Sequence, residues 1–466
     1  MVLRYFLFLF FCSATIYAAR KPGFGSTQQN WGFVPINEKA DMFWWLYYTT
    51  STDDYVQKPL VIWLQGGPGG SSTGIGNFEE VGPMNSKQEQ RDVHWIEHVN
   101  VLFVDNPVGT GFSYVKDSDT SYFAKDNTAI AQDFLVFLKG FLQENTEFQE
   151  VPIYIFGQSY GGKMAADIAL LLHEESKVRN ITCNLTGIAL GDSWISPIDS
   201  LTSWPSYLYN LGFLDFDDFL QLKNMTEFIR EELSTGDYSR ATLYFRATQY
   251  VINMLTTVDY YNVLSEQIKQ NDLKHGDWFH SNLTRTDKNI LRDIMPNDLF
   301  SNIINNKETK NLESDEDDVL STLMNGPVRE TLNITAIADH SDHQWGDQSD
   351  LVFEAVNLDF MKPVTEVIEK LLNETDIEIS VYNGQLDLIV DTPGTLTWVN
   401  NLKWINKDQW VASNRTPIIV DKVYEGYEKR YDKFNFYWVH RAGHMVPTDN
   451  PRTMSYILKQ IAHIGD

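Results

Sequence analysis

The pentapeptide Gly157-Gln-Ser-Tyr-Gly161 lies between a short apolar run and a longer stretch with helical periodicity. The run before it, Ile153-Tyr-Ile-Phe156, is typical of a buried strand, and residues 163–172 are typical of a helix. Glycines at both ends permit the tight, strained turn by which a strand passes directly into a helix. Because such a turn exposes the hydroxyl of its central serine, the pattern predicts that Ser159 is a nucleophile.

The same alternation of strand and helix extends over much of the chain. Further short apolar runs are Leu60 to Leu64, Val101 to Val104 and Leu185 to Leu190, and a helical pattern covers Ala129 to Phe141. Strands that alternate with helices predict β-α-β units in a mostly parallel central sheet with helices on both faces. A strained serine turn within such units is the nucleophile elbow of the α/β-hydrolase fold, which is the fold class that we predict.

The alternation breaks near Trp194 and resumes after Phe360. The interrupted part has helical periodicity at Asp217 to Leu233 and Arg246 to Ile268 and no strong buried strand. The part that follows has predicted strands at Ile377 to Tyr382 and Phe434 to Val439 and a closing helix over Arg452 to Ala462. We therefore predict one α/β-hydrolase domain, made of residues 19–194 and 361–466, that is split by a largely helical cap insertion of residues 195–360.

A nucleophilic serine needs a base, and the base needs a carboxylate that orients it. In this fold the acid follows the serine along the chain and the histidine follows the acid. His444 lies just after a predicted strand, in a turn-rich segment, and Asp387 also follows a predicted strand, with Asp391 as its nearest rival. The order therefore favours Ser159, Asp387 and His444 as a catalytic triad.

Backbone N–H groups must also stabilise the charge that develops on the substrate oxygen. Tyr160 follows the nucleophile and supplies the first of these groups. The segment Gly66-Gly-Pro-Gly-Gly70 follows a predicted strand and suits the second, because glycine lets the backbone approach a substrate closely. A phosphate-binding loop is excluded here, since neither a GK[ST] nor a G-x-G-x-x-G pattern follows.

The charge and the N-terminus bear on partners and compartment. The 466 residues include 37 Lys+Arg and 63 Asp+Glu, for a formal net charge of −26, so we predict no nucleic-acid partner. Arg4, the apolar run from Tyr5 to Phe11 and the small residues that follow have the layout of a secretory signal peptide, residues 1–18. No later stretch has about 18 uninterrupted apolar residues, so we predict no membrane anchor.

Secretory routing also predicts N-linked glycans. The acceptor pattern Asn-x-Ser/Thr occurs at Asn180, Asn184, Asn224, Asn282, Asn333, Asn373 and Asn414. The only cysteines are Cys12 and Cys183, so the chain cannot form an internal disulfide once the signal peptide is removed. We therefore expect a secreted or lysosomal glycoprotein whose stability comes from its core.

Several motifs together resemble those of the serine carboxypeptidases. They are Trp63-Leu-Gln-Gly-Gly-Pro-Gly-Gly-Ser-Ser72, Phe103-Val-Asp-Asn-Pro-Val-Gly-Thr-Gly-Phe-Ser-Tyr114, Gly157-Gln-Ser-Tyr-Gly-Gly162, Asn325-Gly-Pro-Val-Arg329, Asn383-Gly-Gln-Leu-Asp387 and Gly443-His-Met-Val-Pro447. Gln65, Gly70 and Lys163-Met-Ala-Ala166 make the chain most similar to the retinoid-inducible branch of that family. The resemblance runs from about Phe33 to the C-terminus and implies removal of C-terminal amino acids from peptides, often in acidic compartments, without a cofactor.

The resemblance also implies roles for individual residues. It gives the triad positions to Ser159, Asp387 and His444 and the oxyanion-hole positions to the N–H groups of Gly67 and Tyr160. The family binds the substrate's terminal carboxylate with an asparagine, the N–H of the next glycine and a glutamic acid before the nucleophile. These positions fall on Gln65, Gly66 and Gln158, with Glu80 matching a further supporting acid.

Gln158 departs from the family pattern in a way that affects chemistry. A glutamic acid donates to a carboxylate only when it is protonated, whereas a glutamine amide donates at every pH. We therefore expect that peptide binding depends less on acidic pH here than in relatives with the acid.

Other interpretations stay open from the sequence. An acyl-enzyme that reacts with an alcohol would make the chain an acyltransferase, and a secreted binding protein with a quiet active site would not react with a fluorophosphonate.

His94-Trp-Ile-Glu97-His98 has the letters of the zinc-protease motif H-x-x-E-H, but it runs straight into a predicted strand, which leaves little room for the required helix. His340-Ser-Asp-His343 has no companion ligands, so we predict no metal. The oligomeric state is left open, a homodimer included.

Overall fold

The computed structural model of the chain describes residues 21–52, 54–265, 319–334 and 344–465, with a few single residues between 285 and 301. The predicted signal peptide, Asn282 and the segment His340 to His343 lie outside the described residues. The described strands form one twelve-stranded sheet in the order β1-β2-β3-β5-β4-β7-β8-β9-β12-β11-β10, and β6 pairs with β3 beside this path.

The sheet has a parallel centre and antiparallel flanks. The strands are β1 (Lys21–Pro22), β2 (Gln28–Pro35), β3 (Ala40–Tyr47), β4 (Leu60–Leu64), β5 (Asn100–Val104), β6 (Tyr114–Val115), β7 (Pro152–Gln158), β8 (Asn184–Gly191), β9 (Glu378–Gly384), β10 (Arg415–Val420), β11 (Val423–Tyr431) and β12 (Phe434–Val439). All pairings from β5 through β4, β7, β8 and β9 to β12 are parallel. Since parallel strands end on the same edge, the residues that follow β4, β7, β8, β9 and β12 meet there.

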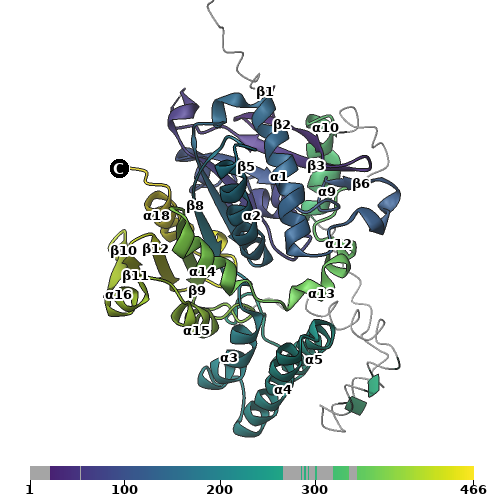
Figure 1. Cartoon of the computed structure of the whole chain (residues 1–466), viewed down its shortest axis with the longest axis vertical. Helices are drawn as coiled ribbons and strands as arrows, with labels where there is room; N and C mark the ends of the chain where they lie inside the picture. The colour runs from purple at the N-terminus through teal and green to yellow at the C-terminus, as the bar shows by residue number, and fades with distance from the viewer. Residues whose placement is uncertain are drawn as a thin grey trace, which may run out of the picture.

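Helices cover both faces of the sheet. The helices are α1 (Asn127–Glu144), α2 (Tyr160–Lys177), α3 (Pro197–Asn210), α4 (Phe216–Thr235), α5 (Tyr238–Thr256), α9 (Val319–Leu323), α10 (Arg329–Thr331), α12 (Asp350–Ala355), α13 (Asn357–Phe360), α14 (Thr365–Glu374), α15 (Thr392–Asn401), α16 (Lys407–Ala412), α17 (Val446–Asp449) and α18 (Pro451–Ile461). Short 3-10 turns are η1 (Tyr55–Gln57), η3 (Trp95–Glu97), η4 (Lys116–Ser118), η5 (Thr120–Tyr122) and η6 (Thr146–Phe148), and two segments with π-type hydrogen bonds are η2 (Ser72–Val81) and η7 (Met324–Val328). Figure 1 shows α1 and α2 side by side in front of the sheet.

The core has two layers because successive strand residues point to opposite faces. Ile62 and Ile155 pack with α1, α2 and α14 on one face, and Trp63 and Tyr154 pack with η2, α9 and α18 on the other. The central strands read as continuous apolar runs because both faces are covered in this way, and every residue of β4 and β5 is buried. The predicted α/β-hydrolase fold is confirmed, although the antiparallel flanks make the sheet as a whole mixed.

The helices α3, α4 and α5 gather in a lobe at the lower end of Figure 1. The predicted helix from Arg246 to Ile268 is confirmed as far as Thr256, where α5 ends, and is wrong for residues 257–265. The helix begins earlier, at Tyr238, and Ile268 lies outside the described residues. Thr257 has a φ of 53°, a left-handed conformation that stops the helix. The segment 258–265 then returns to the sheet edge without regular structure.

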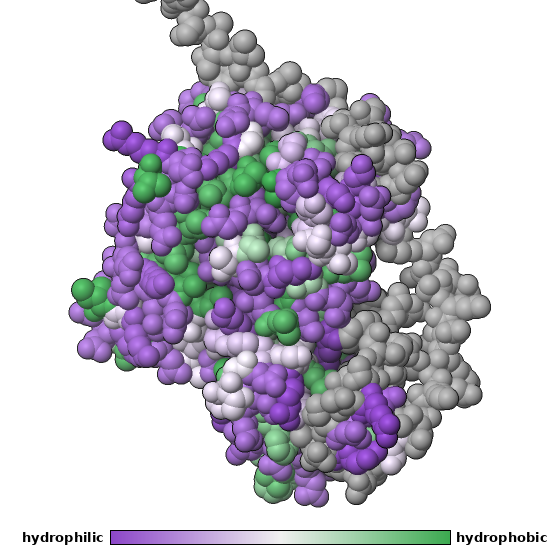
Figure 2. Space-filling model, turned by 45° about the vertical axis from the view of Figure 1, so that its right-hand side comes forward, coloured by the Kyte–Doolittle hydropathy of each residue, from purple (hydrophilic) through white to green (hydrophobic). Residues whose placement is uncertain are grey.

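The surface has hydrophilic residues over most of the face in Figure 2, with hydrophobic residues in patches between them. The predicted glycan acceptors that the structure describes are all exposed, namely Asn180, Asn184, Asn224, Asn333, Asn373 and Asn414. Exposure is what attachment of a glycan requires, and the modification itself stays a prediction. No helix in the described ranges is long and apolar enough to cross a membrane.

Candidate active site

Ser159 lies at the turn between β7 and α2 with a φ of 58° and a ψ of −126°. A residue with a side chain pays roughly 1–3 kcal/mol in such a conformation, so its surroundings must hold it there. The Ser159 N–H donates to the Gly191 carbonyl at 2.9 Å, and the Ser159 carbonyl accepts from the N–H groups of Gly162 (3.1 Å) and Trp194 (3.0 Å). The turn is therefore fixed by backbone contacts to β8 and the residues after it.

The glycines of the pentapeptide are required by space as well as by conformation. A Cβ atom on Gly157 would lie 2.2 Å from the Gly161 carbonyl oxygen, and one on Gly161 would lie 2.1 Å from the Leu64 carbonyl oxygen. Both distances are far below van der Waals contact, so strand β4, the turn and α2 pack backbone to backbone.

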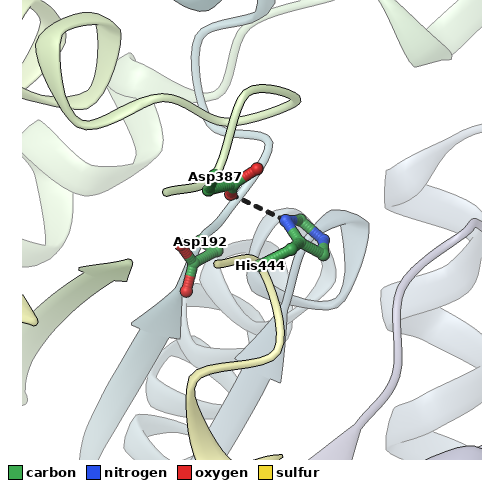
Figure 3. Close-up of side chains that lie close together, drawn as sticks. All are labelled: Asp192, Asp387 and His444. Carbon is green, nitrogen blue, oxygen red and sulfur yellow. Dashed lines mark hydrogen bonds and ion pairs between the residues drawn. The ribbon is translucent and has the colours of Figure 1, made fainter. Parts of the chain in front are cut away.

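His444 and Asp387 form a buried pair at the same edge of the sheet. The His444 Nδ1 atom donates to Asp387 Oδ2 at 2.8 Å (Figure 3). The second Asp387 oxygen accepts from the Val390 N–H at 3.2 Å, and the His444 N–H donates to the Tyr261 carbonyl at 2.7 Å. A carboxylate on Nδ1 fixes the imidazole tautomer and leaves Nε2 as the basic nitrogen.

Ser159 and His444 belong to the described residues, and the structure shows no hydrogen bond between their side chains. Catalytic hydrogen bonds are often long or poorly aligned without a substrate. The backbone connects the two residues instead, because Ser159 bonds to Gly191 and the next residue, Asp192, lies beside Asp387 and His444 (Figure 3).

The glycine-rich segment after β4 lies directly against the nucleophile turn. A Cβ atom on Gly66 would lie 2.6 Å from Ser159 Cβ and 2.8 Å from the Tyr160 nitrogen. Gly67 has a φ of 109°, which residues with side chains rarely adopt. The two predicted sources of oxyanion-hole donors, this segment and Tyr160, are thus neighbours.

The residues Trp345 to Ser349 brace the glycine-rich segment from outside. The Ser349 N–H donates to the Gly69 carbonyl (2.9 Å), and the Ser71 N–H donates to the Asp347 carbonyl (2.8 Å). The indole of Trp345 donates to the Ser71 hydroxyl at 2.9 Å. A stretch that the sequence assigns to the cap insertion therefore holds the predicted oxyanion loop.

Gln65, Gln158 and Glu80 meet in one buried cluster. The amide nitrogens of Gln65 and Gln158 both donate to Glu80 Oε1, at 3.0 and 2.7 Å. Burial raises the pKa of Glu80 to about 8, and the two amide hydrogen bonds oppose this rise. Glu80 Oε2 and Gln158 Oε1 are buried, and each lacks the hydrogen-bond partner that a buried polar atom normally has.

A cavity of about 300 Å³ lies between the His444 loop and η2. Its lining residues are Phe78, Glu79, Asn85, Ser86, Arg91, Tyr261, Asn262, Met445, Thr448 and Asp449. Two of the lining residues are sequence neighbours of predicted site residues, since Met445 follows His444 and Glu79 precedes Glu80.

The zinc-protease letters around Glu97 do not form a helix. The residues between the histidines are a single 3-10 turn, and His94 is extended with a φ of −150°. His98 Nε2 lies 3.2 Å from the Ser455 hydroxyl, while His94 Nε2 lies 3.9 Å from Glu97. The two histidines therefore do not share one helix face, as that motif demands.

The model of one protein family, described as serine carboxypeptidase, matches residues 21–463. The chain belongs to the serine carboxypeptidase family. The family resemblance inferred from the motifs is thereby confirmed, and with it the prediction of a serine-type carboxypeptidase, a hydrolase. Membership of this family implies peptide substrates.

Relatives in the family span nearly the whole chain. The retinoid-inducible serine carboxypeptidase of Rattus norvegicus is 41% identical over 433 residues, which cover 90% of this chain and 88% of the relative. Serine carboxypeptidase-like 51 of Arabidopsis thaliana is 34% identical and covers 90% of this chain and 89% of its own. The crystal structure of a prohormone-processing carboxypeptidase from Saccharomyces cerevisiae has a TM-score of 0.73 at 22% identity, with 94% and 91% coverage, and supports the fold.

Three parts of this serine carboxypeptidase site are not predicted from the sequence. They are Asp192, the carbonyl of Tyr261 that orients the His444 loop, and the brace from Trp345 to Ser349. Only Asp192 had a local signal, because it is a carboxylic acid directly after a predicted buried strand. The other two act through long-range backbone contacts that residue types do not encode.

Proposed function

We propose that this serine carboxypeptidase removes C-terminal amino acids from peptides through an acyl-enzyme on Ser159. The observation that carries the proposal is the buried Asp387–His444 pair at the edge where the strained Ser159 turn also lies. In this mechanism His444 Nε2 takes the proton from Ser159 Oγ as the oxygen attacks the scissile carbonyl, and then gives it to the leaving amine. Water then attacks the acyl-enzyme through the same two proton transfers by His444 and releases the acyl group.

Asp387 has an electrostatic part in each of these steps. Its carboxylate holds the imidazole in the required tautomer and stabilises the imidazolium that forms. The N–H groups of Gly67 and Tyr160 stabilise the oxyanion, which is supported by the contact between the glycine-rich segment and Tyr160.

The buried cluster is proposed to receive the terminal carboxylate of the substrate. The groups involved are the amides of Gln65 and Gln158, the N–H of Gly66 and the carboxyl group of Glu80. Because the pKa of Glu80 is about 8, this group is neutral at acidic and neutral pH and can donate a hydrogen bond from Oε2. Gln158 adds no titrating group, which supports binding that persists toward neutral pH.

The side chain of the departing residue has a place in this proposal. We propose that this side chain enters the 300 Å³ cavity, whose lining includes the sequence neighbours of His444 and Glu80. The cavity carries both Arg91 and the acids Glu79 and Asp449 beside Phe78 and Met445. This mixed lining favours uncharged side chains over a single charge type.

The division into domains, the compartment and the glycan modification are parts of the same proposal. We propose the division into an α/β-hydrolase domain of residues 19–194 and 361–466 and a cap of residues 195–360, supported by the helices α3 to α5, α12 and α13. We also propose a secreted or lysosomal glycoprotein that loses residues 1–18.

The experiment compares labelling with turnover. The wild-type protein and Ser159→Ala are treated with a fluorophosphonate probe and, separately, with peptides that have a free or an amidated C-terminus. Labelling at Ser159 with release of single residues from free C-termini supports the proposal. Labelling with transfer to an added alcohol in place of hydrolysis indicates an acyltransferase, and no labelling indicates a quiet binding protein.

A further inference from the structure

Asp192 places a second buried carboxyl group beside the proposed catalytic acid (Figure 3). It directly follows β8, and one oxygen from each of Asp192 and Asp387 and one nitrogen of His444 lie within 4.8 Å of one another. Asp192 Oδ1 accepts the Gly384 N–H at 2.7 Å, and its own N–H donates to the Tyr382 carbonyl at 2.9 Å. Asp192 therefore joins the end of β8 to the last residues of β9, directly before the loop that carries Asp387.

The hydrogen bonds differ between the two carboxyl groups. Both oxygens of Asp387 accept, one from His444 and one from the Val390 N–H, and this favours the charged form of Asp387. Asp192 Oδ2 is buried and has no hydrogen-bond partner as an acceptor. Two buried like charges so close together are unfavourable, so the proton of the pair belongs on Asp192.

Further titratable groups interact with the pair. Glu80 and the buried phenol of Tyr382 interact electrostatically with Asp192, and Asp391 interacts with Asp387. Burial raises the pKa of Glu80 to about 8 and that of Asp391 well above its usual value, so neither acid adds a charge to the pair at acidic pH. Burial, and then the charge of Asp387, raise the pKa of Asp192 well above its usual value.

We propose that Asp192 is a positioning residue that stays protonated, donates a hydrogen bond from Oδ2 to the Asp387 carboxylate and anchors Gly384 through Oδ1. This inference rests on the proposed roles of Asp387 and His444. The donated hydrogen bond fixes the direction of the Asp387 carboxylate toward the imidazole, and the anchor fixes its loop. The pair then carries one negative charge, so His444 has the single counter-charge of an ordinary Ser-His-Asp triad.

Two substitutions separate the charge of Asp192 from its hydrogen bonds. Asp192→Asn keeps an acceptor for Gly384 and a donor toward Asp387, and it imitates the protonated acid. Asp192→Ala removes both. The rate at which a fluorophosphonate labels Ser159 is measured against pH in the wild-type protein and in each variant.

The expected result is that the acidic limbs of the wild-type and Asp192→Asn profiles overlay within about 0.3 pH unit, because neither carries a charge at position 192. Asp192→Ala is expected to react at least about tenfold more slowly than Asp192→Asn. A shift of the Asp192→Asn limb to lower pH by about one unit would show that the wild-type Asp192 is ionised, and would overturn the proposal. Equal rates for the two variants would also overturn it.

A second measurement does not depend on turnover. The pKa of His444 is obtained by NMR titration of histidine-labelled wild-type protein and Asp192→Asn, which decides the question if Asp192→Ala does not fold. Equal His444 pKa values support the proposal, and a lower pKa in Asp192→Asn contradicts it. If the wild-type protein is not labelled at Ser159, the proposed function fails, while this titration still tests the role of Asp192.

Discussion

The Nδ1 atom of His444 lies 2.8 Å from Oδ2 of Asp387, and both side chains are buried. The two residues are 57 positions apart, and each follows a strand of the parallel centre of the sheet. Their meeting is a consequence of topology, because β9 and β12 are parallel neighbours that end at one edge. The base of the proposed mechanism thus has a fixed tautomer before any substrate binds.

Asp387→Asn is expected to lower kcat by roughly 10³–10⁴-fold, because an amide at this position favours the wrong imidazole tautomer. Steady-state hydrolysis of a free-C-terminal peptide measures the effect. Asp391→Asn is the matched control, since Asp391 is also buried but caps α15 and accepts from Ser203. A larger loss of kcat in Asp391→Asn than in Asp387→Asn would contradict the assignment of Asp387 as the acid of the triad.

Gly66→Ala is expected to abolish most activity while the fold persists. The added methyl group would meet Ser159 Cβ at 2.6 Å, so the nucleophile or the oxyanion loop must move. Displacement of a catalytic group by about 1 Å costs on the order of 10²-fold in rate. Gly326→Ala serves as the control, because a Cβ there meets nothing within 4 Å. Comparable rates for Gly66→Ala and Gly326→Ala would contradict the claim that the glycine-rich segment forms part of the active site.

The pKa of Glu80 leads to a prediction of how peptide binding changes with pH. Its pKa of about 8 lies above the usual value, so the neutral donor prevails below pH 8 and the anion prevails above it. Because the anion repels a substrate carboxylate, KM for free-C-terminal peptides is expected to rise as the pH passes through about 8. Glu80→Gln is expected to remove this rise, as read from KM between pH 6 and about 9.

The converse variant tests the same explanation. Gln158→Glu introduces a second titrating acid beside Glu80 and is expected to move the optimum of kcat/KM to more acidic pH. An amidated peptide, which has no terminal carboxylate, is the control substrate. Superimposable profiles for the wild-type protein and Gln158→Glu would contradict the assignment of this cluster to carboxylate binding.

Loss of the buried ion pair between Lys163 and Asp359 is expected to have a large effect on stability. Its fully buried Nζ lies 3.0 Å from Asp359 Oδ2, and the same oxygen accepts from the Tyr160 hydroxyl at 3.3 Å. Lys163→Met removes the buried cation from Asp359 and leaves only the exposed Lys362 near it, which is expected to lower the free energy of unfolding by about 3–5 kcal/mol. Lys362→Met, which removes an exposed cation 4.0 Å from Asp359, is expected to cost less than about 1 kcal/mol. Denaturant unfolding measures both.

The parallel centre of the sheet is predictable because its strands are covered on both faces. Leu60 to Leu64 is predicted and observed as β4 with the same bounds, since five successive apolar residues have no other stable place. The antiparallel strand β11 escapes prediction because its sequence is rich in charged residues and only two of its nine residues are buried. The end of α5 escapes it because Thr257 adopts a left-handed conformation that its residue type does not favour.

The candidate site also contains residues that the sequence predicts and residues that it does not. Ser159, Asp387 and His444 can be selected because each follows a predicted strand and their order is fixed by the fold. The role of Asp192 depends on how close two separate loops come, and the brace of Trp345 to Ser349 depends on backbone hydrogen bonds. Such long-range distances are properties of the folded chain, not of local residue patterns.

The central claim is that Ser159 is the nucleophile of a carboxypeptidase, and one paired measurement tests it most directly. A peptide library with free C-termini is incubated with the wild-type protein and with Ser159→Ala, and the products are read by mass spectrometry. The expected result is loss of single C-terminal residues with the wild-type protein and no loss with Ser159→Ala. Unchanged peptides with a folded wild-type protein, or equal trimming by Ser159→Ala, would contradict it.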